Sequence, residues 1–248
     1  MGIAGAGNSG TVFAALLAPV LAAAYGWSNV FGFALIPLVL CIFVFAWLAK
    51  NAPERPKAKS MSDYFKALGD RDSWWFMFFY SVTFGGFIGL ASALPGYFND
   101  QYGLSPVTAG YYTAACVFGG SLMRPLGGAL ADRFGGIRTL LGMYAVATIS
   151  IAAVGFNLPS SYAALALFVC TMLGLGAGNG AVFQLVPQRF RREIGVMTGL
   201  IGMAGGIGGF ALAAGMGAIK QSTGSYQLAL WLFASLGVLA WFGLHGVK

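Results

Sequence analysis

The chain has 248 residues, of which 58% are hydrophobic and only 8% are charged. A soluble domain usually carries about 25% charged residues, so most of this surface must face lipid instead of water. The net charge of +7 comes from short basic clusters between apolar runs, which is typical of membrane topology signals and not of a nucleic-acid-binding face. We therefore predict an all-α, polytopic membrane protein that contacts the lipid bilayer and has no nucleic-acid partner.

About eight apolar windows are long enough to cross a hydrocarbon core, which requires about 20 residues of helix. Because every backbone polar group must be paired inside the bilayer, we expect these windows to be helices. In chain order they lie at 2–24, 28–49, 73–97, 106–131, 137–156, 161–187, 194–218 and 226–246.

The basic residues fall on one side of this predicted bundle. They lie in the loop 50–72 and in two turns, at 132–138 and 188–193, whereas the alternate loops contain only Lys220. The positive-inside rule then places both termini and the loop 50–72 in the cytoplasm of a multi-pass protein of the cell (inner) membrane.

The loop 50–72 also divides the chain. It is the only long polar stretch, and its composition suits a solvated linker or an amphipathic surface helix. Two spans precede it and six follow it, although transporter folds are built from repeats of equal size. We therefore predict that residues 1–49 are the last two helices of an incomplete N-terminal half and that residues 73–248 are a six-helix C-terminal half. On this interpretation the chain is a fragment of a larger fold.

Arg124 is the only charged side chain within a predicted span, apart from residues at helix ends. It precedes Asp132, at the end of the same span, by eight residues, which places it roughly 12 Å deeper and near the membrane midplane. A midplane arginine costs at least about 2.5 kcal/mol and normally faces a bundle interior or a water-filled cavity. Its guanidinium fork suits a planar oxyanion. The alternative is a structural arginine bonded to carbonyls of a helix broken at Pro125.

Two glycine-rich segments begin the first and the seventh span. One is Gly2–Gly10, and the other contains Gly199, Gly202, Gly206 and Gly209 on one helix face. Small residues on one face let two helices approach closely in lipid, so simple helix packing would explain either segment. Their separation by six spans, as in two matched halves, favours two related helices that line one central path.

The segments Gly2–Gly10 and Thr198–Phe210 resemble the two signature segments of the nitrate/nitrite porter family, within the major facilitator superfamily. The segment at 128–138, GALADRFGGIR, resembles the cytoplasmic loop motif of that superfamily. The resemblance covers essentially the whole chain and makes its eight spans similar to helices five to twelve of a twelve-helix fold. It implies alternating-access transport of nitrate, nitrite or both, by exchange or by import coupled to protons.

The resemblance also implies a substrate site. Six positions match the pocket of the family: Arg124, Tyr80, Phe84, Asn8, Gly199 and Gly202. A serine can stand in place of Gly202, which leaves one substrate hydrogen bond open, and the family's second arginine lies on its second helix, which has no counterpart among the predicted spans. Asn179 and Gln184 are also polar residues within a span, but such side chains usually bond across helices, so we leave them outside the predicted site.

The loop motif predicts a gate at the cytoplasmic mouth. Asp132 and Arg133 end one helix and Arg138 begins the next, so we expect these charges to pair with the other half and to hold one gating state. Two alternatives remain open. One is a carrier of another small anion, such as a carboxylate. The other is a membrane-embedded enzyme or a non-transporting interaction protein, although the sequence contains no catalytic set and predicts neither a cofactor nor a metal ion.

Overall fold

The computed structural model describes residues 2–50 and 60–246, without the side chains of residues 2–6, 8 and 9. Within these ranges the chain is helical and contains no strand. In chain order the elements are α1 (Gly2–Tyr25), α2 (Trp27–Leu48), α3 (Met61–Leu68), α4 (Arg71–Tyr80), the π-helix η1 (Ser81–Gly85), α5 (Gly86–Tyr102), α6 (Pro106–Phe134), α7 (Gly136–Val154), α8 (Ser161–Arg189), α9 (Ile194–Thr223), α10 (Gln227–Gly243) and the 3₁₀ turn η2 (Leu244–Gly246).

Each of the eight predicted spans falls on a long helical segment. The third consists of α4, η1 and α5, which form one continuous segment of 32 residues. Among the described residues, 6 helical segments are long and apolar enough to cross a membrane. The other two predicted spans fall on α1, whose apolar part runs from Gly10 to Tyr25, and on the 29-residue α6, which carries Arg124. The all-α membrane fold is therefore confirmed.

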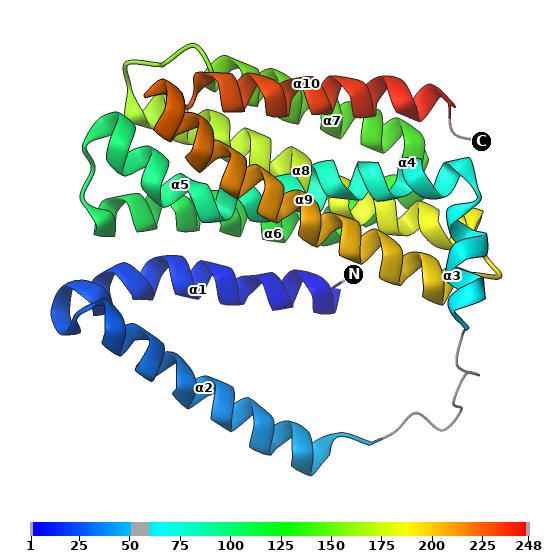
Figure 1. Cartoon of the computed structure of the whole chain (residues 1–248), viewed down its shortest axis with the longest axis horizontal. Coiled ribbons are helices and arrows are strands. Elements are labelled where there is room, and N and C mark those ends of the chain that lie inside the picture. Colours follow the sequence, from blue (N-terminus) through cyan, green and yellow to red (C-terminus); the bar gives the residue numbers. More distant parts are fainter. Residues whose placement is uncertain (1, 51–59, 247–248) are drawn as a thin grey trace.

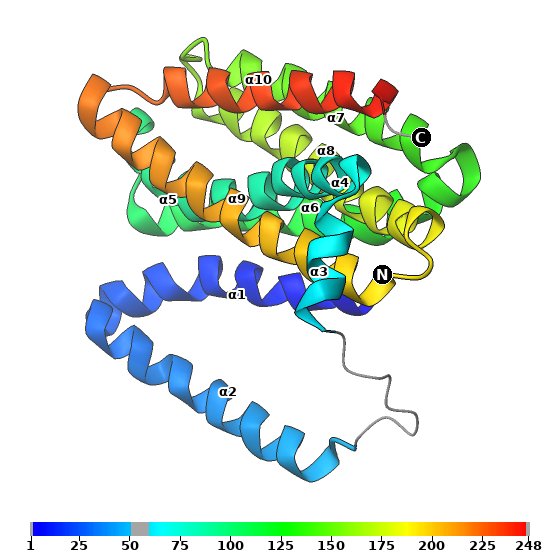
Figure 2. The same cartoon turned by 45° about the vertical axis from the view of Figure 1, so that its right-hand side comes forward.

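The helices from α4 to α10 form a bundle, and α1 lies along one side of it against α6 (Figure 1). Helix α2 diverges from the bundle, in agreement with its lack of any buried residue (Figure 2). The buried core consists mainly of aromatic and aliphatic side chains from α4 to α10. This arrangement leaves one long side of α9 open, because α1 contacts α6 instead.

Helices α6 and α8 pack backbone to backbone near the middle of the bundle. A Cβ atom added at Gly176 would overlap the carbonyl oxygen of Gly120, and one added at Gly180 would overlap the carbonyl oxygen of Arg124. Small residues permit this close approach in a membrane, where packing and not water exclusion holds helices together. The contact places residues 176–180 of α8 at the level of residues 120–124 of α6.

The basic side of the bundle begins with α3, a short helix within the loop 50–72. Its first turn is closed by a capping box in which Ser60 and Asp63 exchange hydrogen bonds. Beside it, Arg189 at the end of α8 forms ion pairs of 2.9 Å with Asp70 and 2.6 Å with Asp72. These contacts connect the C-terminus of α8 to the N-terminus of α4.

Candidate functional site

Arg124 lies near the middle of α6 and is buried, with 7% of its surface exposed. The helix continues through Pro125, and the hydrogen bond recorded for Arg124 goes to a side chain of another helix and not to a carbonyl. Its Nε has no hydrogen-bond partner. Among the described residues, both ion pairs belong to Arg189, so Arg124 is a buried cation without a carboxylate partner in this part of the chain.

Two aromatic side chains contact the guanidinium. Tyr80 ends α4, and Phe84 lies one turn further on, in η1. The Tyr80 hydroxyl accepts a 2.9 Å hydrogen bond from an Nη of Arg124, and the Phe84 ring centre lies 5.3 Å from the Arg124 Cζ. The two rings are stacked, with centroids 5.0 Å apart. The structure thus brings together Arg124, Tyr80 and Phe84 beside a π-helical turn, a feature frequent at functional sites.

Phe183 of α8 and Gly205 of α9 surround the same tyrosine. The Phe183 ring meets that of Tyr80 edge-on, with centroids 4.8 Å apart. A Cβ atom at Gly205 would lie 2.7 Å from the Tyr80 ring and 2.9 Å from the Phe84 ring, so a side chain there would displace both. Neither residue stands out in the sequence, because Phe183 is one of 21 phenylalanines and Gly205 is one of 38 glycines.

The other predicted pocket residues are not part of this cluster. Gly199 and Gly202 lie on the exposed side of α9, where a Cβ atom would meet nothing within 4 Å. The close backbone approach of α9 to η1 is made instead by Gly205 and Gly208. Asn8 lies in α1, but its side chain is outside the part of the chain that the structure describes. A pocket role for these three residues stays a prediction.

The loop-motif residues lie where α6 meets α7. Asp132 accepts a 3.0 Å hydrogen bond from Nε2 of Gln184 on α8, so Gln184 bonds across helices as expected. The Arg133 guanidinium lies 5.4 Å from the Phe134 ring centre, and Arg138 is exposed in the first turn of α7. No ion pair within the described ranges involves these three charged residues. Their pairing with another half stays a prediction.

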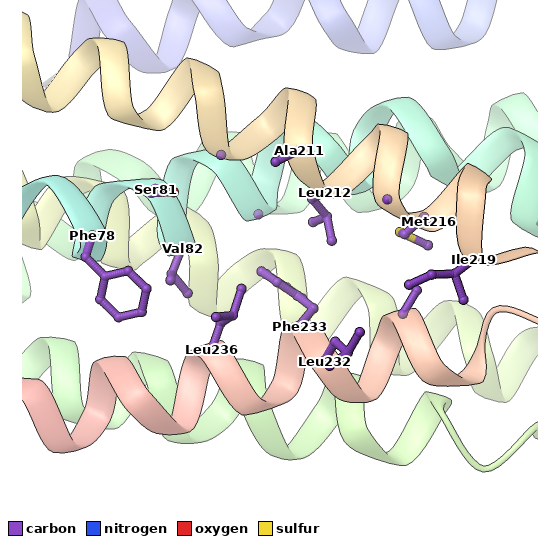
Figure 3. Close-up of a pocket in the computed structure, with 14 residues that line it drawn as sticks. Phe78, Ser81, Val82, Ala211, Leu212, Met216, Ile219, Leu232, Phe233 and Leu236 are labelled. Atoms are coloured by element: carbon purple, nitrogen blue, oxygen red, sulfur yellow. The ribbon is translucent and has the colours of Figure 1, made fainter.

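An apolar cavity of about 230 Å³ lies between η1, α9 and α10 (Figure 3). Side chains such as Phe78, Leu212 and Phe233 point into it, and no charged side chain lines it. Arg124 is not among its lining residues. The cavity therefore offers nothing that would neutralise an anion, and the chemistry for anion binding is concentrated at Arg124.

Long apolar helices around a buried cation define a multi-pass membrane protein with a candidate anion site. The chain belongs to the Major Facilitator Superfamily, whose family model matches residues 1–213. This membership assigns it to the transport proteins and not to the enzymes. It also agrees with a solved structure, a bacterial homologue of the iron transporter ferroportin in the inward-facing state, which has a TM-score of 0.67. The two sequences are 17% identical, and the match covers 96% of this chain and 60% of the chain in that structure.

Three curated relatives are similar over nearly the whole chain. The nitrite extrusion protein of Bacillus subtilis is 33% identical over 96% of this chain and 60% of its own length. The probable nitrate transporter NarT of Staphylococcus haemolyticus is 32% identical over 96% of this chain and 62% of its own length. The probable nitrate/nitrite antiporter NarK1 of Thermus thermophilus is 29% identical over 99% of this chain and 62% of its own length. The chain thus spans about three-fifths of the length of these relatives, and they confirm the resemblance to nitrate/nitrite porters.

Proposed function

We propose that the protein takes part in the transport of nitrate, nitrite or both across the membrane by alternating access. The names of the relatives support this substrate class, since they refer to nitrate transport, to nitrite extrusion and to nitrate/nitrite antiport. The site residues that we propose are the six matched by resemblance, and Arg124 is the principal one.

One observation carries the proposal, namely that Arg124 is buried at midspan without a carboxylate partner among the described residues. An arginine at a helix centre costs about 2.5–3.5 kcal/mol to insert in a membrane, so an unpaired one has a functional reason by default. A bound anion would offset this cost. Arginine also suits planar anions in particular, because its fork donates two parallel hydrogen bonds.

The surroundings of Arg124 support a small planar anion over a larger one. Tyr80 and Phe84 contact the guanidinium, and the ring of Phe183 packs against that of Tyr80, so a ligand there would meet flat apolar surfaces. The Tyr80 hydroxyl accepts a hydrogen bond from one Nη of Arg124, whereas the Nε of Arg124 has no partner and can donate to a ligand. No observation favours a carboxylate substrate.

The acidic residues bear on the mode of transport. Asp72, Asp100 and Asp132 lie near the ends of their helices, away from the level of Arg124. A proton relay would require a titratable group closer to the substrate, so their positions support exchange over proton coupling. We keep proton-coupled import as the alternative within this function.

We also propose the membrane topology and the division of the chain predicted from its basic loops. Both termini and the loop 50–72 would lie in the cytoplasm, with residues 73–248 forming one half of the transporter. Residues 1–49 would belong to the other half. This division is supported by α2, which buries no residue, and by α1, which packs against α6 of the bundle.

Thermal unfolding of the purified chain in lipid nanodiscs tests the proposal. A ligand at 100 times its dissociation constant stabilises a protein by about 2.7 kcal/mol, so nitrate and nitrite should raise the midpoint in proportion to the logarithm of concentration. Acetate at the same ionic strength is the control. Stabilisation by acetate but not by nitrate would favour a carboxylate carrier, and no stabilisation by any anion would contradict an anion site in this chain.

A further inference from the structure

Asn179 is a fully buried amide in the middle of α8, with 0% of its surface exposed. Neither its Oδ1 nor its Nδ2 has a hydrogen-bond partner in the described structure. Buried polar groups in native proteins are nearly always bonded, and an unsatisfied amide is costly. This residue therefore does not bond across helices as the sequence led us to expect, and its presence needs another explanation.

The neighbours of Asn179 place it at the level of Arg124. A Cβ atom at Gly178 would contact Thr83 of η1, and one at Gly180 would contact the carbonyl oxygen of Arg124. Asn179 lies between these two residues on a helix that turns about 100° per residue, so its side chain points between η1 and α6. These are the two elements that carry Phe84 and Arg124.

The spacing of residues along α8 also indicates that the side chain of Asn179 points towards the surroundings of Arg124. Asn179 precedes Phe183 by four residues, and residues four apart share one face of a helix. The Phe183 ring contacts the ring of Tyr80, whose hydroxyl is bonded to Arg124. On α6, the hydroxyl of Ser121, one turn before Arg124, is also buried without a partner. Unpaired buried polar groups thus lie on two helices, one turn from Phe183 on α8 and one turn from Arg124 on α6.

We propose that Asn179 contacts the substrate, with its Nδ2 donating a hydrogen bond to an oxygen of the anion held by Arg124. This inference rests on the proposed function. Nitrate and nitrite carry several acceptor oxygens and no donor, so they need donors from more than one direction. Arg124 supplies donors from α6, and Asn179 supplies one from α8. Together they would hold the plane of the anion between the two helices and the rings of η1.

The test is the variant Asn179→Leu, which keeps the branched shape and the number of side-chain heavy atoms and removes both polar atoms. Nitrate affinity is measured from nitrate-dependent thermal unfolding of the 248-residue chain in lipid nanodiscs. We expect a loss of affinity of about tenfold or more, because a hydrogen bond to a charged group is lost. Without nitrate the midpoint should not fall, since an unsatisfied amide is replaced by an apolar group.

Thr171→Val is the matched control. Thr171 lies on the same helix, is also fully buried, and its hydroxyl donates to the Leu167 carbonyl within the helix. The Thr171→Val variant should therefore bind nitrate with unchanged affinity. If Asn179→Leu instead binds nitrate normally, or loses stability without nitrate while its nitrate response persists, Asn179 is a structural amide and the inference is overturned. If the wild-type chain itself shows no response to nitrate, the proposed function fails and the inference fails with it, an outcome that the wild-type curve alone identifies.

Discussion

Replacing Arg124 by methionine separates a functional arginine from a structural one. Methionine is unbranched, flexible and uncharged, so it fills the space of the aliphatic part of Arg124 without a guanidinium. A structural arginine would stabilise the fold through its contacts, and its removal would weaken the bundle. An arginine retained for anion binding would give the fold little net stability, and its removal would abolish binding instead.

The contacts of Arg124 give the expected magnitude. The substitution removes an insertion cost of about 2.5–3.5 kcal/mol. It also removes the hydrogen bond to Tyr80, about 1.5–3 kcal/mol for a charged donor, and the contact with Phe84, about 2 kcal/mol for a desolvated pair. These contributions oppose each other, so the free energy of unfolding without nitrate should fall by less than about 2.5 kcal/mol. The stabilisation by nitrate, about 2.7 kcal/mol at 100 times the dissociation constant, should disappear.

Chemical or thermal unfolding in nanodiscs, with and without nitrate, measures both quantities. Arg189→Met is the matched control, because Arg189 is paired with Asp70 and Asp72 at the surface. It should lose up to about 1 kcal/mol of stability and keep the nitrate response. A loss of about 3 kcal/mol or more in Arg124→Met without nitrate would refute the reasoning, since that is the cost of breaking a buried, paired charge.

Three further substitutions test the surroundings. Tyr80→Phe should weaken nitrate binding about tenfold, because the bond that orients Arg124 is lost; titration by thermal shift measures this. Gly205→Ala should also weaken binding, because its Cβ displaces Tyr80, whereas Gly217→Ala, on the same helix and also with open space around its Cβ, should not. Asp132→Asn should lower turnover in a transporting preparation more than it raises the nitrate KM; a collapse of affinity with normal turnover would rule out the gate.

The sequence predicted the helices well because their signal is local. A run of about 20 apolar residues can only be helical in lipid, and so each predicted span coincides with a helical segment of the structure. Arg124 was equally accessible to prediction, since a lone charge within an apolar span stands out in any window. Its aromatic neighbours required the family resemblance, because a tyrosine and a phenylalanine one turn apart are common in a chain with 15% aromatic residues.

The partners of the polar residues on α8 could not be predicted in the same way. Asn179 and Gln184 are five residues apart and look alike in the sequence, and both were assigned to bonding across helices. Gln184 does bond to Asp132, but Asn179 has no partner in the described structure. The difference depends on which neighbouring helix the side chain of each residue faces. That direction is fixed by the close contact of Gly176 and Gly180 with α6, which is a tertiary feature.

The packing of α9 on η1 connects the site to the open side of the bundle. Gly205 lies against the rings of Tyr80 and Phe84, while Gly202 on the same helix faces open space. A shift of α9 that brings Gly205 closer to η1 must therefore move Tyr80, because an aromatic ring in van der Waals contact cannot be compressed. Tyr80 in turn is bonded to Arg124, so the guanidinium must move or lose that bond. If an element packed on the open side of α9 displaced this helix, the guanidinium of Arg124 would thus move or lose its hydrogen bond to Tyr80.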